Sequence, residues 1–152
     1  MSQTVLITGA SNGIGKACAR VFARKGYDLV LVARHREKLE AVKAELSEYD
    51  IQLKVIAMDL TGEDAAVDLY NDLVLDDINI DILVNNAGFG DHGAFHDSSW
   101  EKQKKMVLLN IVALMQMTYV FGQSMKRRKK GRILNVASIA GLLSLIHISG
   151  AH

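Results

Sequence analysis

Short apolar runs alternate with helical patterns along the chain. The runs predict five strands, over residues 4–8, 28–33, 51–56, 80–84 and 132–137. Between them, apolar residues recur every three or four positions, which is the period of an amphipathic helix. Strands that alternate with helices indicate repeated βα units, and such units build a parallel sheet.

The third run has a different pattern from the others. Gln52 and Lys54 alternate there with apolar residues, which favours a half-exposed strand at the edge of the sheet. Right-handed crossovers separately predict the strand order 3-2-1-4-5, and that order also places the third strand at an edge. We therefore expect a single α/β domain over residues 1–152, with a doubly wound parallel sheet of the Rossmann type.

The helices are predicted from the faces that they would bury. The expected core positions are Ile14, Ala17, Cys18, Val21 and Phe22 in the first helix, Leu39, Val42, Leu46 and Tyr49 in the second, and Val67, Tyr70, Leu73 and Val74 in the third. Two helix starts carry capping patterns, Thr61 with Asp64 and, before a long helix, Ser98 with Glu101. Gly131 is expected to end the long helix.

A glycine turn connects the first predicted strand to the first predicted helix. Glycines at such a place let the backbone turn tightly and bring bare N–H groups close to an anion. The helix N-terminus adds unpaired donors and a favourable dipole. The turn therefore predicts a site for the pyrophosphate of a dinucleotide. Its expected contacts are Thr8, Gly9, Ser11, Asn12, Gly13, Ile14 and Gly15.

A P-loop for a nucleoside triphosphate is the alternative for this turn. That motif requires glycine at position 10 and serine or threonine at position 17. The chain has Ala10 and Ala17 at these places, so no hydroxyl is placed to hold magnesium. The sequence disfavours a P-loop.

The end of the second strand distinguishes the two nicotinamide cofactors. An acid about 20 residues past the glycines binds the ribose 2′-hydroxyl of NAD, whereas an arginine accommodates the 2′-phosphate of NADP. Arg34 occupies the position directly after the second predicted strand, and no acidic residue lies between Asp28 and Glu37. The sequence predicts NADP over NAD. A solvated Arg34 without a ligand is the plainer alternative.

Composition and charge bear on the setting of the protein. Lysine and arginine number 18 against 17 acids, a net charge of +1, which predicts no nucleic-acid or anionic membrane partner. The basic run at residues 126–130 fits a helix C-terminus better than a nucleic-acid site. No signal peptide and no apolar stretch of membrane-spanning length is expected. With Cys18 as the only cysteine, we expect a cytoplasmic protein.

Four motifs follow one another at the ends of predicted strands. They are TGASNGIG at residues 8–15, Asp59-Leu60, NNAG at residues 85–88 and NVAS at residues 135–138, with Asn110 in the long helix. Together they resemble the classical short-chain dehydrogenases/reductases over residues 4 to about 141. The resemblance implies cofactor contacts from Asp59, Leu60, Asn86, Ala87 and Gly88. It implies active-site roles for Asn110 and Ser138.

Each of these residues also has a plainer explanation. Asp59 suits a turn, residues 85–88 suit a tight loop, Asn110 suits a polar group satisfied in the core, and Ser138 suits a helix cap. Taken together at the spacing of the family, the functional interpretation is favoured.

The resemblance implies hydride transfer between a nicotinamide and a carbonyl or alcohol carbon of a small-molecule substrate. In that family a tyrosine exchanges the proton with the substrate oxygen, and a neighbouring lysine lowers a tyrosine pKa that is ordinarily about 10. The chain has no tyrosine after Tyr119 and no lysine after Lys130, so the Tyr-x-x-x-Lys pair is absent.

We therefore expect an incomplete domain that lacks its C-terminal strands and is inactive alone. A non-catalytic dinucleotide-binding module is the alternative. The resemblance also implies that the long helix contributes to a homo-oligomer interface in complete members of the family.

Residues 142–152 depart from the family pattern. Residues 143–149 resemble the translation of an adaptor used in sequencing libraries, which makes 142–152 a candidate non-native tail. An ordinary apolar loop is the alternative. His92 and His96 have a spacing seen in metal sites but lack a third ligand, so we expect no bound metal.

Overall fold

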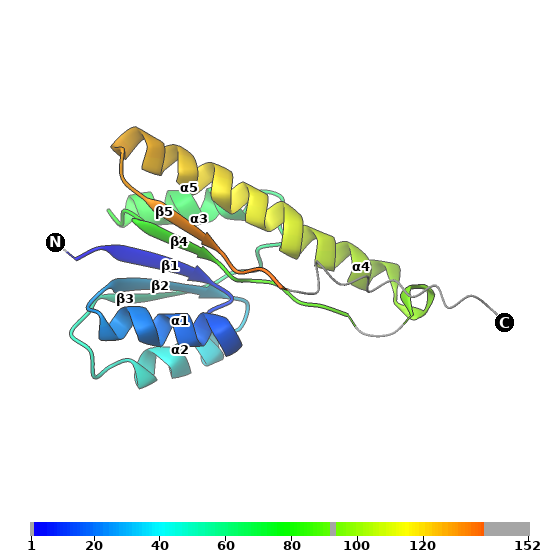
Figure 1. The fold of residues 1–152 in the computed structure, drawn as a ribbon, viewed down its shortest axis with the longest axis horizontal. Coiled ribbons are helices and arrows are strands. Elements are labelled where there is room, and N and C mark those ends of the chain that lie inside the picture. Colours follow the sequence, from blue (N-terminus) through cyan, green and yellow to red (C-terminus); the bar gives the residue numbers. More distant parts are fainter. Residues whose placement is uncertain (1, 92–93, 139–152) are drawn as a thin grey trace.

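The structure, a computed structural model, describes residues 2–91 and 94–138. Five parallel strands form one sheet in the order β3-β2-β1-β4-β5 (Figure 1). Its strands are β1 (Thr4–Thr8), β2 (Asp28–Ala33), β3 (Leu53–Ala57), β4 (Ile82–Asn85) and β5 (Arg132–Asn135). The predicted α/β fold and strand order are confirmed.

The third strand, β3, lies at the edge of the sheet and is half-exposed, as the sequence predicts. All five of its residues are half-buried, so buried and exposed positions do not alternate. Ile56 packs against the core on one face of the sheet, while Leu53 and Val55 pack against the core on the other. Polar and apolar residues alternate along this strand, yet both of its faces pack against a core.

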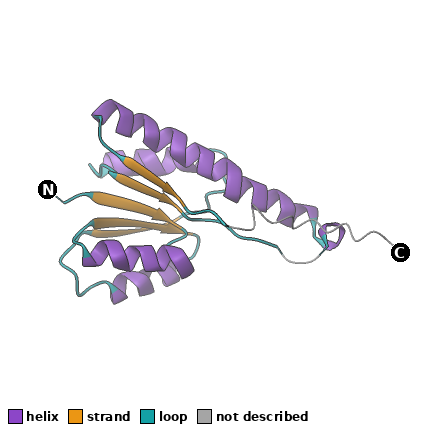
Figure 2. Ribbon diagram, viewed as in Figure 1, coloured by secondary structure: helices purple, strands orange, loops and turns teal. Residues whose placement is uncertain are grey.

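Helices cover both faces of the sheet (Figure 2). One face carries α1 (Gly13–Arg24) and α2 (Arg36–Glu45), and the other carries α3 (Ala65–Leu75) and the long helix. The long helix consists of α4 (Trp100–Val107), the π-helical segment η2 (Leu108–Ala113) and α5 (Leu114–Arg128). A single 3-10 turn, η1 (Phe95–Asp97), precedes it, and α4 extends past the end of the sheet (Figure 1).

The buried faces of α1 and α3 are built from smaller residues than predicted. In α1, Gly15, Ala19 and Ala23 are buried, because small residues let the helix lie close to the sheet. The larger Ile14 and Val21 are 60% and 44% exposed, so their assignment to the core was wrong. Ala17 is exposed as well.

The same correction applies to α3, where four residues face the core. They are Ala65, Ala66, Leu69 and Leu73. Val67 and Val74 are exposed instead. Tyr70 packs edge-on against Phe121 of α5, with ring centroids 5.6 Å apart, as its predicted core position requires.

Three predicted helix ends also need correction. The N-cap of α3 is Asp64, and Thr61 instead donates to Asp59. The N-cap of α4 is Ser99, whose side chain accepts from the Lys102 amide; the neighbouring Ser98 donates to Asp91.

At its other end, α5 stops at Lys129, which adopts the left-handed conformation with φ +52°. Gly131 follows and lies against the Met125 side chain.

The long helix changes one expectation from the sequence. Trp100–Arg128 is long and apolar enough to cross a membrane by length and composition, with a mean hydropathy of 1.4 over 18 residues. The expectation that no such stretch exists was therefore wrong. Ala113, Met117, Phe121 and Met125 of this helix are buried in the described part of the protein. Core helices of soluble proteins, which are mostly buried, pass the same test of length and composition, whereas 17% of the 18-residue window is buried here.

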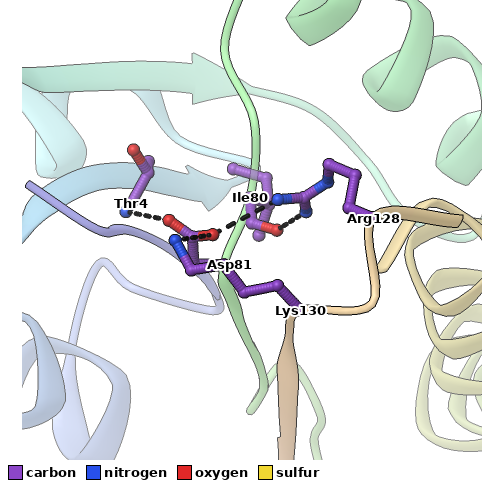
Figure 3. Close-up of polar contacts among 5 residues, drawn as sticks. All are labelled: Thr4, Ile80, Asp81, Arg128 and Lys130. Atoms are coloured by element: carbon purple, nitrogen blue, oxygen red, sulfur yellow. Dashed lines mark hydrogen bonds and ion pairs between the residues drawn. The ribbon is translucent and has the colours of Figure 1, made fainter. Parts of the chain in front are cut away.

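An ion-pair network anchors the C-terminal end of α5 to the start of β4 (Figure 3). Asp81, which is 7% exposed, lies 3.2 Å from Arg128 Nη1 and 3.0 Å from Lys130 Nζ through Oδ1. Its Oδ2 accepts from the Thr4 amide at 3.2 Å, and Arg128 also donates to the Ile80 carbonyl. Two cations of the basic run thus hold three segments together.

Burial alone would raise the pKa of Asp81. The contacts with Lys130, the Thr4 amide and Arg128 outweigh this effect and hold the pKa of Asp81 below its ordinary value. Ionised Asp81 therefore stabilises the folded state.

We expect Asp81→Asn to lower the free energy of unfolding by about 2 kcal/mol, because a largely buried charged acceptor is lost. Guanidinium unfolding of the chain, followed by circular dichroism, measures this change. The matched control is Asp76→Asn, which removes an exposed ion pair with Lys54 and should cost at most about 0.5 kcal/mol. Equal losses in the two variants would contradict the anchoring role.

The Asp81 contribution should also depend on pH. An unfolded aspartate has a pKa of about 3.9, and the folded-state pKa of Asp81 lies lower. The stabilisation is therefore complete above the unfolded-state pKa and is lost as the pH falls through the folded-state pKa. The difference between the original chain and Asp81→Asn should shrink below about pH 4.

Candidate cofactor-binding site

The hydroxyl of Thr8 connects the ends of β1 and β4. It accepts hydrogen bonds from the amides of Asn86 and Ala87, each at 3.0 Å, and donates to the Val84 carbonyl at 3.3 Å. Thr8 is 2% exposed, so water does not compete for these groups. The loop after β4 is thereby fixed against the glycine turn.

The Asn86 side chain adds a second connection between the same segments. Its Nδ2 donates to the carbonyls of Thr8 at 3.0 Å and Gly9 at 3.2 Å. Asn86 thus holds the backbone of the glycine turn, and its side chain points under the turn rather than away from it.

Two glycines of the turn are required by space. Gly9 has φ +65°, and a Cβ there would lie 2.9 Å from the Ala87 Cα. At Gly15 a Cβ would lie 2.4 Å from the Gly9 carbonyl oxygen and 2.5 Å from Asn86 Nδ2. Side chains at either position would separate the turn from the loop after β4.

An open cavity of about 260 Å³ lies above this junction. It brings together many of the residues predicted to bind a cofactor: Gly9, Ser11, Asn12, Arg34, Leu60, Ala87 and Gly88. Thr8, Gly13, Gly15 and Asn86 build the turn and its support instead of lining the cavity. Ile14 is exposed in the first turn of α1, outside the lining.

Six lining residues were missed by the sequence reasoning: Ala33, His35, Lys38, Met58, Phe89 and Leu109. Ala33, His35, Lys38 and Met58 follow or end a strand at the carboxyl edge of the sheet, where doubly wound folds bind ligands. That general rule could have identified them. Leu109 comes from η2 and is brought to the site by tertiary packing.

Asp59 follows β3 and is held by Thr61. Its Oδ1 accepts from the Thr61 amide at 3.0 Å and from the Thr61 hydroxyl at 2.8 Å. The Thr61 amide makes the largest contribution to lowering the pKa of Asp59, burial opposes it, and the positive charges of Arg34 and Lys105 lower that pKa further. Asp59 therefore stays ionised near Arg34.

Asn110 lies in η2 and pairs with the backbone of Phe89. Its Nδ2 donates to the Phe89 carbonyl at 2.9 Å, and the Phe89 amide donates to Oδ1 at 3.1 Å. A Cβ at Gly88 would lie 3.1 Å from the same Oδ1. The side chain of Asn110 thus connects the long helix to the loop after β4.

Asn85 ends β4 and forms a further polar junction that the sequence reasoning did not identify. Its Nδ2 donates to Asn135 Oδ1 at 2.9 Å and to Thr118 Oγ1 at 3.0 Å. The junction links β4, β5 and α5. Ser138 follows β5 at the same edge of the sheet and is exposed.

Other sequence predictions lie wholly or partly outside the described residues. His92 and residues 142–152 are among these, so the candidate tail stays a prediction. Within residues 2–91 and 94–138, the structure holds no group of three side chains suited to a metal ion.

The fold and these motifs are similar to those of known proteins. A sequence model of the family described as short chain dehydrogenase matches residues 3–150. The chain belongs to this family. A very-long-chain 3-oxoacyl-CoA reductase of Coccidioides immitis is 35% identical over 144 residues, which cover 91% of this chain and 41% of that protein.

Solved structures of other short-chain dehydrogenases superimpose closely. A bulky-bulky ketone specific alcohol dehydrogenase from Comamonas testosteroni matches with a TM-score of 0.86 at 35% identity, over 93% of this chain and 57% of that one. A short-chain dehydrogenase from Sphingobium yanoikuyae in complex with NADPH gives 0.86 at 36% identity, over 94% and 56%. The chain spans about half the length of the curated relatives it matches.

We expect Thr8→Val to destabilise the protein by about 2 kcal/mol, because the amides of Asn86 and Ala87 lose their buried acceptor while the side-chain shape is kept. Chemical unfolding measures the loss. Hydrogen exchange at these two amides should become faster.

Thr8→Ser is the matched control for this variant. It keeps the hydroxyl and removes one methyl group, so we expect a loss of about 1 kcal/mol and unchanged exchange at both amides. Slow exchange in Thr8→Val would show that the hydroxyl does not hold the loop.

Proposed function

We propose that this chain forms the cofactor-binding part of an NADP-dependent oxidoreductase. The complete protein would transfer hydride between NADP(H) and the carbonyl or alcohol carbon of a small molecule. The observation that carries the proposal is the cavity itself, whose lining combines the bare backbone of the glycine turn with the exposed Arg34.

The cradle under the glycine turn fits a pyrophosphate. Side chains at Gly9 or Gly15 would fill it, and Asn12 caps α1 without a side-chain hydrogen bond to the first turn. The amides from Ser11 to Gly15 therefore suit an anion at a helix N-terminus. In this proposal, Asp59 and Leu60 contact the adenine.

Since β1 separates β2 from β4 in the sheet, the loop after β4 and the segment with Arg34 and Lys38 follow strands on opposite sides of β1. In the loop after β4, Asn86, Ala87 and Gly88 would hold the nicotinamide half of the cofactor, which supplies the hydride when bound. Asn110 would keep this loop in place through Phe89, and Ser138 would polarise the substrate oxygen. Because the sequence has no Tyr-x-x-x-Lys pair after Ser138, we expect the 152-residue chain to bind cofactor without turnover.

A non-catalytic dinucleotide-binding module is the second candidate. It predicts the same binding but no activity in any longer form of the protein. We infer a cytoplasmic setting because Cys18 is the only cysteine in the sequence. One cysteine cannot form a disulfide within the chain, which fits a reducing compartment.

We further propose that the complete protein is a homo-oligomer that uses the long helix. Val107, Ile111, Met115 and Tyr119 recur every four residues along it, and each is between 48% and 69% exposed. A continuous apolar stripe of this kind is typical of an interface.

Fluorescence titration tests the cofactor proposal. NADPH should bind more tightly than NADH, and Arg34→Ala should weaken NADPH binding about tenfold through loss of a charge-assisted contact. NADH binding should change little, because its 2′-hydroxyl is uncharged. The control is Arg24→Ala, at the last turn of α1. Tighter binding of NADH by the original chain would overturn the NADP assignment.

Light scattering after size-exclusion chromatography tests the oligomer proposal. Met115→Lys places a charge in the stripe and should shift the mass toward the monomer, because an unpaired charge opposes burial at an interface. Asn71→Lys adds the same charge on the exposed surface of α3 and should leave the mass unchanged. A monomeric original chain would count against this use of the helix.

A further inference from the structure

Where the segment after β2 meets the cavity, three neighbouring residues of that segment line it. They are Arg34, His35 and Lys38, and all three are exposed. No carboxylate occurs among the described residues that line the cavity. This part of the lining therefore has an excess of positive charge that the glycine turn lacks.

The cations of this segment differ in the carboxylates that balance their charge. Arg36 pairs with Glu40 one turn along α2, at 3.7 Å, and it does not line the cavity. Arg34 lies near Asp59, whose pKa it lowers, so part of its charge is already balanced. Lys38 forms no ion pair with any residue in the described ranges.

The first turn of α2 adds donors at the same place. His35 is the N-cap of α2, and its side chain makes no capping hydrogen bond. The first amides of the helix are thus without a side-chain acceptor, and the helix dipole favours an anion there. Lys38 belongs to this turn and lines the cavity.

We propose that Lys38 is a second cation for the adenosine 2′-phosphate and, beside Arg34, a determinant of the preference for NADP. This inference rests on the proposed function and adds a residue to it. A phosphate offers three oxygens to donors; the guanidinium of Arg34 engages at most two of them side by side, and the compact ammonium of Lys38 suits the remaining one.

The test compares Lys38→Gln with Arg36→Gln, two neutral variants of exposed cations in the first turn of one helix. The ligands are NADPH, NADH, and the fragments 2′,5′-ADP and 5′-AMP, titrated by calorimetry or fluorescence. Lys38→Gln should weaken NADPH and 2′,5′-ADP about fivefold through one lost charge-assisted contact. NADH and 5′-AMP should change less than about twofold. Arg36→Gln should leave all four affinities unchanged.

Two further variants separate charge from structure. Lys38→Arg keeps the charge and should keep NADPH binding near that of the original chain. Lys38→Glu should weaken NADPH more than Lys38→Gln does, because it repels the phosphate. Thermal unfolding of each variant should match the original, since Lys38 is exposed.

The outcomes distinguish this inference from the function on which it rests. If the original chain binds neither NADPH nor NADH, the proposed function fails and the role of Lys38 falls with it. If NADPH binds and Arg34→Ala weakens it, but Lys38→Gln behaves like Arg36→Gln, the function stands and the role of Lys38 is overturned. Equal weakening of NADPH and NADH by Lys38→Gln would also overturn it.

Discussion

The buried hydroxyl of Thr8 holds together the carboxyl ends of β1 and β4, and the geometry of the cavity depends on this contact. It accepts from two backbone amides of one loop and donates to a carbonyl of the same chain segment. Asn86 reciprocates by donating to the backbone of the glycine turn. Together these bonds bring the two segments so close that there is no room for a side chain at Gly9 or Gly15.

This close approach explains which parts of the fold the sequence could predict. Strand order follows from buried runs and crossover handedness, both of which are local or general constraints. The glycine turn is likewise recognisable, because only glycine satisfies its backbone and its space. The residues that touch across the sheet edge, such as Thr8 with Ala87, become visible only once the strands are placed.

The errors have a common physical origin in tertiary packing. Hydrophobicity favoured Ile14 and Val21 for the buried face of α1, but the helix lies close to the sheet through Gly15, Ala19 and Ala23. By sequence, Glu101 favours Ser98 as the helix cap. Asp91, seven residues before Ser98, engages Ser98 instead and leaves Ser99 to cap α4. Asp81 and Arg128 are 47 residues apart, so no local pattern predicts their ion pair.

In the proposed complex, the cavity would bind two phosphate groups by different means, and this difference decides which residues a motif can reveal. The pyrophosphate cradle uses backbone amides, so its requirement is for missing side chains, and the glycines record that requirement in sequence. The proposed 2′-phosphate site would use side chains on an exposed helix turn, where Arg36 and Lys38 are cations two residues apart. Their roles separate because Glu40 engages Arg36 while Lys38 lines the cavity. If the proposal holds, substitution at this turn would change specificity for the cofactor without disturbing the junction of β1 and β4 on which the cavity depends.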